Sequence, residues 1–140
     1  MIFTADIEDW QQSVYDFDRA VSNRVVRNTS RLLDILDTHK VKGTFFIQGM
    51  VAEKFPQLIR SIAQAGHELA SHSHTHRMIY NLTEAQFRAE MQRSVGLLED
   101  ISGTKVIGFR APRFRYATTF STGIALRCGN RGLFTTHPLC

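Results

Sequence analysis

The feature that most constrains the fold of this chain is a regular alternation of short apolar runs with longer amphipathic segments. Apolar runs rich in β-branched and aromatic residues predict buried strands, and apolar residues spaced three or four apart predict helices. Such alternation indicates parallel strands, because a parallel pair needs a long connection, usually a helix. Strands are expected at 2–6, 42–48, 67–71 and 105–109, helices at 22–39, 51–65 and 83–102, and a loop at 10–21.

Local signals support these helix boundaries. Ser22 is a suitable N-cap for the first helix, and Pro56 is expected to break the second helix or to begin its main part. Thr83 followed by Gln86 is the sequence pattern of a capping box. Gly66 lies where the second helix should end. The sequence therefore predicts an α/β fold with parallel strands and outer helices.

Composition places the chain among ordinary globular proteins. Its 140 residues are 43% hydrophobic and 21% charged, which is enough for one domain with its own core. No apolar run approaches the roughly 18 residues that a membrane span needs. The first residues do not combine a basic segment with an apolar one, so we expect no signal peptide and a cytoplasmic location.

Charge is distributed unevenly along the chain. Residues 1–100 carry 11 Lys/Arg and 13 Asp/Glu, whereas residues 101–140 carry 6 Lys/Arg and no acid. Because only this last segment is basic, nucleic acid is not an expected partner. Cys128 and Cys140 also lie in the last segment, and two cysteines alone make neither a disulfide framework nor a cysteine-type zinc site.

Ionisable residues gather where the expected strands end. Asp6 ends the first strand with Glu8 and Asp9 just after it, and His72 and His76 follow the third strand. Parallel α/β folds place their sites at these strand ends, and ionisable groups resist burial unless they are paired or bind a metal. Two histidines four residues apart and one carboxylate are ligands that catalytic zinc and related divalent ions favour.

Arg110 follows the fourth expected strand. A guanidinium beside Asp6 would keep that carboxylate ionised and fix its direction. Each group also has a structural interpretation, because the histidines and acids could form polar surface loops and the arginine an exposed strand end. The convergence of all three groups at one edge of the sheet favours an enzyme.

These motifs, in this order and spacing, resemble those of the NodB-homology polysaccharide deacetylases, carbohydrate esterase family 4 (CE4). The match is closest to the branch associated with bacterial exopolysaccharide export and the PEP-CTERM system, and it covers residues 1–112. The matching segments are DIEDWQ at 6–11, KGTFF at 42–46, AGHELASHSHTH at 65–76 and GFRAP at 108–112.

The resemblance implies the N-terminal part of a deformed (β/α) barrel and the metal-dependent removal of N-acetyl, or sometimes O-acetyl, groups from a polysaccharide. It implies Asp6 as the catalytic base and Arg110 as the residue that orients this base. The resemblance favours zinc over cobalt or nickel as the metal. Two histidines and one carboxylate would hold it, and either of two acids could supply the carboxylate. The candidate ligands are His72, His76, Glu8 and Asp9.

The resemblance ends at Pro112. The family's general acid, a histidine in a later L-x-H motif, has no counterpart here, because His137 lies in a different setting. A complete barrel also needs about 200 residues or more. We therefore expect a partial deacetylase domain at 1–112 and a divergent or, as we favour, out-of-frame tail at 113–140. Part of the metal affinity should survive, while turnover should be very low or nil.

Two further functions are compatible with residues 1–112. One is hydrolysis of a small cyclic amide, as in allantoinase-like members of the same superfamily. The other is a non-catalytic glycan-binding remnant that keeps the groove without the general acid. A substrate panel separates the first from deacetylation, and glycan binding without acetate release would indicate the second.

Overall fold

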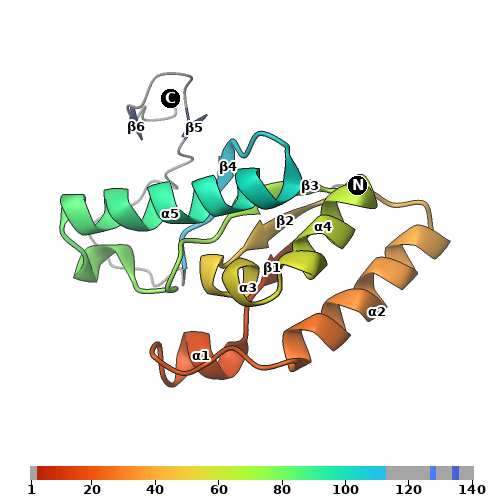
Figure 1. Cartoon of the computed structure of the whole chain (residues 1–140), viewed down its shortest axis with the longest axis horizontal. Coiled ribbons are helices and arrows are strands. Elements are labelled where there is room, and N and C mark those ends of the chain that lie inside the picture. Colours follow the sequence, from red (N-terminus) through yellow and green to blue (C-terminus); the bar gives the residue numbers. More distant parts are fainter. Residues whose placement is uncertain (1–2, 113–126, 129–133, 136–140) are drawn as a thin grey trace.

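The computed structural model describes residues 3–112, 127–128 and 134–135 of the chain. Four parallel strands form a sheet in the order β1-β2-β3-β4, and helices connect them along the chain (Figure 1). The strands are β1 (Phe3–Ile7), β2 (Gly43–Ile47), β3 (Glu68–Ser71) and β4 (Gly108–Phe109). The helices are α1 (Trp10–Val14), α2 (Arg24–Thr38), α3 (Gly49–Lys54), α4 (Pro56–Gln64), the 3-10 turn η1 (Ile79–Asn81) and α5 (Glu84–Ser102). A separate antiparallel pair joins β5 (Arg127–Cys128) to β6 (Phe134–Thr135).

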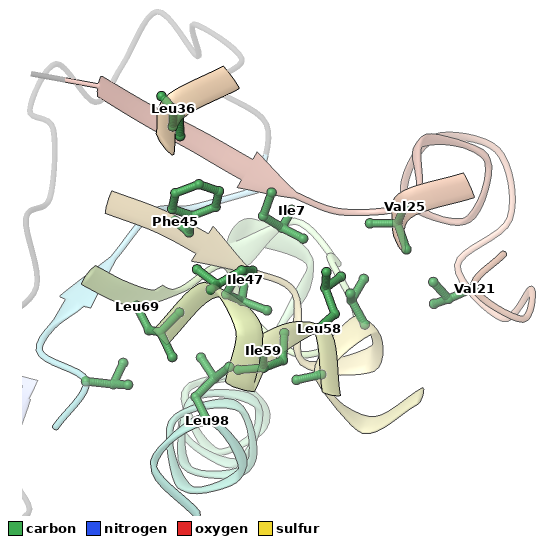
Figure 2. Close-up of a cluster of buried hydrophobic side chains, with 14 residues drawn as sticks. Ile7, Val21, Val25, Leu36, Phe45, Ile47, Leu58, Ile59, Leu69 and Leu98 are labelled. Atoms are coloured by element: carbon green, nitrogen blue, oxygen red, sulfur yellow. The ribbon is translucent and has the colours of Figure 1, made fainter. Parts of the chain in front are cut away.

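The core lies between the sheet and its helices. Apolar strand residues, including Ile7, Ile47 and Leu69, pack against helix residues such as Ile59 and Leu98 (Figure 2). Burying one such side chain contributes about 1.5–3 kcal/mol relative to leaving it exposed. Because successive strand residues point to opposite faces, alternate positions of the same strands, among them Thr4, Asp6 and Phe46, lie on the other face of the sheet.

Capping interactions fix the ends of the longest helix, α5. Thr83 accepts a hydrogen bond from the backbone N–H of Gln86, and the Gln86 side chain accepts one from the N–H of Thr83. The helix ends at Gly103, whose φ of 69° is left-handed and suits glycine. The capping box expected from the sequence is therefore confirmed.

The segment expected as a loop at 10–21 contains the short helix α1. Asp9 is its N-cap, because the Asp9 side chain accepts a hydrogen bond from the backbone N–H of Gln11. The next helix, α2, begins at Arg24 with Asn23 at the N-cap position, one residue after the expected Ser22, and Asn23 makes no side-chain capping hydrogen bond. The Ser22 hydroxyl accepts the backbone N–H of Arg24 at 3.4 Å, and the Ser22 backbone N–H donates to the Asp9 carboxylate.

Pro56 separates α3 from α4 and begins the second of them, so the expected break in the 51–65 helix is confirmed, although α3 already starts at Gly49. The fourth strand comprises two residues rather than the five expected at 105–109, and it pairs with Ala70 and Ser71, the last two residues of β3.

Within the described residues, no helix combines the length and the apolar character that a membrane crossing requires. Most of the expected tail at 113–140, including His137 and Cys140, lies outside the described residues.

Candidate metal centre

The ends of β1 and β3 bring one carboxylate and two histidines together. Ile7 and Ser71, the last residues of these strands, are both in register with Ile47 of β2, which lies between them. The residues that follow, Glu8 and His72, therefore leave the sheet at the same edge. The chain then turns sharply, which returns His76 to the side of His72.

The three side chains meet at one point. Glu8 Oε2 lies 2.5 Å from His76 Nε2 and 3.4 Å from His72 Nε2. One ligand atom of each residue lies within 4.8 Å of the ligand atoms of the other two. Both histidine side chains are 3% exposed, and the Glu8 side chain is 24% exposed. This spacing is compact enough for a single ion to contact all three residues.

Backbone carbonyls orient both imidazoles. His72 Nδ1 lies 2.9 Å from the carbonyl oxygen of Arg110, and His76 Nδ1 lies 3.1 Å from that of Ser13. A carbonyl can only accept, so each Nδ1 carries the proton and donates it. In the neutral rings each Nε2 then presents a lone pair toward the Glu8 carboxylate. Histidine ligands of metals are held in this way, with the second ring nitrogen donating to a carbonyl or carboxylate.

The same geometry is unfavourable without a positive charge. Glu8 Oε2 is buried and makes no hydrogen bond, and it faces two imidazole nitrogens. Burial alone would raise the pKa of Glu8, and the pKa falls to about 2 only where the facing imidazoles of His72 and His76 donate hydrogen bonds or carry positive charge. With neutral rings whose Nε2 lone pairs face the carboxylate, that positive charge has to come from elsewhere. Two nitrogens and one carboxylate oxygen around a common point fit the donor set of a divalent cation such as zinc.

Asp6 and Arg110 form a second pair beside this centre. One Arg110 nitrogen donates to Asp6 Oδ1 at 2.6 Å, and another donates to Thr4 Oγ1 at 2.9 Å. The guanidinium also lies 3.9 Å from the centre of the Phe46 ring. The arginine is thus held by three contacts, and it fixes the direction of the Asp6 carboxylate.

Asp9 lies outside the metal cluster, although the sequence left it open as the carboxylate ligand. Its two oxygens accept hydrogen bonds from the backbone N–H groups of Gln11 and Ser22. Burial would raise the pKa of Asp9, but the hydrogen bonds from Ser22 and Gln11 and the charge of Arg24 lower it. The structure therefore brings Glu8, and not Asp9, to the histidines.

A pocket of about 200 Å³ opens between β1 and α2 beside these groups. Asp6 and Glu8 are both among the residues that line it. Trp10 and Arg24 also line it, and Trp10 is 46% exposed. The pocket thus offers charged, polar and aromatic groups to a ligand.

Several groups that organise the centre were not expected from the sequence. The carbonyl of Ser13 accepts a hydrogen bond from His76, and Gln12, which is itself bound to Gln48, donates one to the carbonyl of Thr75. Glu90 of α5 binds the turn between the two histidines. Every residue has a backbone carbonyl, so residue type does not indicate which one accepts a hydrogen bond. A glutamate on a helix is ordinarily exposed, so no sequence signal identifies these contacts.

Known proteins resemble this chain over parts of its length. The sequence model of the family described as "Polysaccharide deacetylase" matches residues 12–131. A peptidoglycan-N-acetylglucosamine deacetylase of Bacillus cereus is 35% identical over 75 residues, which are 54% of this chain and 27% of that protein. A chitooligosaccharide deacetylase of Sinorhizobium fredii is 48% identical over 48 residues, or 34% of this chain and 22% of that protein.

The fold is also found among solved structures. A CE4 family pseudoenzyme from Bacillus anthracis superposes with a TM-score of 0.60 at 30% identity, covering 64% of this chain and 33% of that one. The expected α/β fold of parallel strands with helices, the N-terminal part of a (β/α) barrel, is therefore confirmed. The chain spans about a quarter of the length of the Bacillus cereus relative. The family match begins after Asp6 and Glu8 and continues past residue 112.

Proposed function

Because this chain belongs to the polysaccharide deacetylase family, we propose that its strand-end site binds a divalent cation and hydrolyses acetyl groups on a glycan. The observation that carries the proposal is the convergence of Glu8, His72 and His76, with both Nδ1 atoms committed to carbonyls. In this proposal these three residues hold the cation, and zinc is favoured over cobalt or nickel because it accepts two nitrogens and an oxygen in a compact site.

The cation would supply Lewis acidity, which polarises an acetyl carbonyl and lowers the pKa of water. The protein itself would supply a base beside the proposed cation position. Asp6 lies two residues before Glu8 on the same strand end, and it lines the same pocket. Asp6 would accept the proton of the attacking water, and Arg110 would hold the carboxylate in its direction.

The substrate that we propose is an N-acetylated polysaccharide, with exopolysaccharide as the biological context. Support comes from the relatives, whose names specify peptidoglycan N-acetylglucosamine and chitooligosaccharides. The exposed ring of Trp10 at the pocket rim suits the apolar face of a sugar, and the nearby charges suit its polar groups. The relatives do not favour the cyclic-amide alternative.

The metal centre is tested by zinc titration of the purified chain. Loss of a ligand should cost more than loss of an outer partner, which typically costs about 10–100-fold in metal affinity. We therefore expect His72→Ala and His76→Ala each to weaken zinc binding by more than about 100-fold. His39→Ala is the matched control, because His39 is exposed at the end of α2. Equal zinc affinity in all four proteins would refute the metal centre.

Acetate release from N-acetylated oligosaccharides, with and without zinc or cobalt, tests the activity. We expect very slow release that depends on the metal and is lost in Asp6→Asn. Similarity to a CE4 pseudoenzyme supports a second candidate function, non-catalytic glycan binding. Oligosaccharide binding with no acetate release at any metal concentration would favour that second function over deacetylation.

A further inference from the structure

The turn that carries both histidines, residues 72–76, has an unfavourable backbone. Ser73 has a φ of 63° and His76 a φ of 67°, and both values lie in the left-handed region that residues with side chains rarely adopt. Such a conformation persists only where the surroundings hold it. We call residues 72–76 the histidine turn.

The carboxylate of Glu90, on α5, binds the middle of the histidine turn. Oε2 accepts hydrogen bonds from Ser73 Oγ at 2.8 Å, the His74 backbone N–H at 2.9 Å and the Thr75 backbone N–H at 2.8 Å. Oε1 accepts one from Thr75 Oγ1 at 2.9 Å. One side chain thus satisfies two backbone and two hydroxyl donors on three consecutive residues, all between the two candidate ligands.

The other side of the turn is held by α3. The backbone N–H groups of Gly49 and Met50 donate to the carbonyls of Ser73 and His74 at 2.9 and 3.1 Å. Glu90 therefore binds the donors of the turn while α3 binds its acceptors. Burial would raise the pKa of Glu90, but the hydrogen bonds from Thr75, Ser73 and His74 lower it. The carboxylate is accordingly ionised at neutral pH and accepts strong, charge-assisted hydrogen bonds.

We propose that Glu90 is a positioning residue of the metal centre, which holds the histidine turn so that His72 Nε2 and His76 Nε2 face Glu8. Glu90 is not among the three candidate ligands, and it acts through the backbone of residues 73–75. This inference rests on the proposed function only in that the two histidines are taken to bind a metal. It predicts that the affinity for the metal depends on Glu90, a residue of α5 that is not itself a ligand.

The test compares zinc affinity by calorimetric titration in four proteins: wild type, Glu90→Ala, Glu90→Gln and Glu99→Ala. Glu90→Ala should weaken zinc binding about 10–100-fold, as removal of outer partners of metal ligands does. Glu90→Gln keeps an oxygen for the two backbone donors and should lose less than about tenfold. Glu99 is the matched control, because on the same helix it accepts the backbone N–H of Val106 and the amine of Lys105, far along the chain from the turn.

The outcomes separate this inference from the proposed function. Wild-type affinity in Glu90→Ala, or an equal loss in Glu99→Ala, would overturn the role of Glu90 while leaving the metal centre intact. If the wild type itself bound no zinc, the proposed function would fail, and amide hydrogen exchange of the metal-free chain would decide the inference. Faster exchange at His74 and Thr75 in Glu90→Ala, with no change in Glu99→Ala, would support it. Unchanged exchange would overturn it.

Discussion

Glu8 and Asp9 are adjacent carboxylates that the structure uses in different ways. Asp9 is 3% exposed, and its oxygens accept backbone N–H groups at the start of α1 and before α2. Glu8 points the other way, toward two imidazoles, and its buried Oε2 makes no hydrogen bond. A carboxylate satisfied by N–H groups stabilises the fold, whereas one facing imidazole lone pairs is suited to a cation.

Asp9→Asn should destabilise the chain without removing the metal centre. The amide has one acceptor oxygen, so its NH₂ group must face an N–H donor at Gln11 or Ser22. A buried donor without a partner costs about 1–3 kcal/mol. Chemical denaturation at neutral pH should therefore show a loss of that size, with zinc affinity unchanged. Equal stability of the two proteins would contradict this role of Asp9.

The same variant has a defined pH dependence. The pKa of Asp9 is lowered from its ordinary value of 3.8 in the folded chain, so its stabilising contribution is complete above that value. The contribution is lost as the pH falls below 3.8 toward the lower pKa of the folded state. The stability difference between wild type and Asp9→Asn should therefore shrink in this acidic range.

Residue pattern alone identified the histidine pair, Asp6 and Arg110 as candidates, because ionisable side chains at strand ends are conspicuous. It could not choose between Glu8 and Asp9, since that choice depends on where the chain turns after Ile7. It also could not identify Glu90, whose contacts with residues 73–75 arise only when α5 packs beside β3.

At the scale of elements, α5 couples the histidine turn to the rest of the fold. Its N-terminal half carries Glu90, and its apolar face contributes Met91 and Leu98 to the buried interior. Its start is fixed by the capping box of Thr83 and Gln86. Because the buried residues fix the position of α5, they also fix the position from which Glu90 binds the histidine turn.

Thr83→Ala should destabilise the chain by about 1 kcal/mol, because it removes the side chain that caps α5. Thr38→Ala is a control at an exposed helix end, where the hydroxyl binds only the carbonyl of Asp34 within α2. We expect the control to change stability by less than about 0.5 kcal/mol. Thermal or urea unfolding measures both, and a larger loss in the control would contradict the capping role.

Helices and strands were predictable where the local sequence signal is strong. The helix α5 has both an apolar periodicity and a capping box, and β2 is a compact run of aromatic and β-branched residues. Two errors came from tertiary contacts. The helix α1 depends on Asp9, whose capping role is not evident among three neighbouring acids. The strand β4 pairs only with Ala70 and Ser71 at the end of β3, and no property of residues 105–109 reveals that limit.

At the scale of the whole molecule, the proposed cation joins two strands that do not hydrogen-bond to each other. β1 and β3 lie on either side of β2, and Glu8 and His72 follow their ends. A ligand that binds only the folded chain stabilises it by about 2.7 kcal/mol at a concentration of 100 times its dissociation constant. A cation bound there would therefore stabilise the sheet as well as serve the proposed reaction.

X-ray absorption spectroscopy of the zinc-loaded chain tests this account most directly, because it reports the atoms bound to the metal. The account predicts two imidazole nitrogens and carboxylate oxygen at about 2.0–2.2 Å, with the imidazole signal reduced to one ring in His76→Ala. A first shell dominated by sulfur at about 2.3 Å, or a spectrum unchanged in His76→Ala, would contradict it.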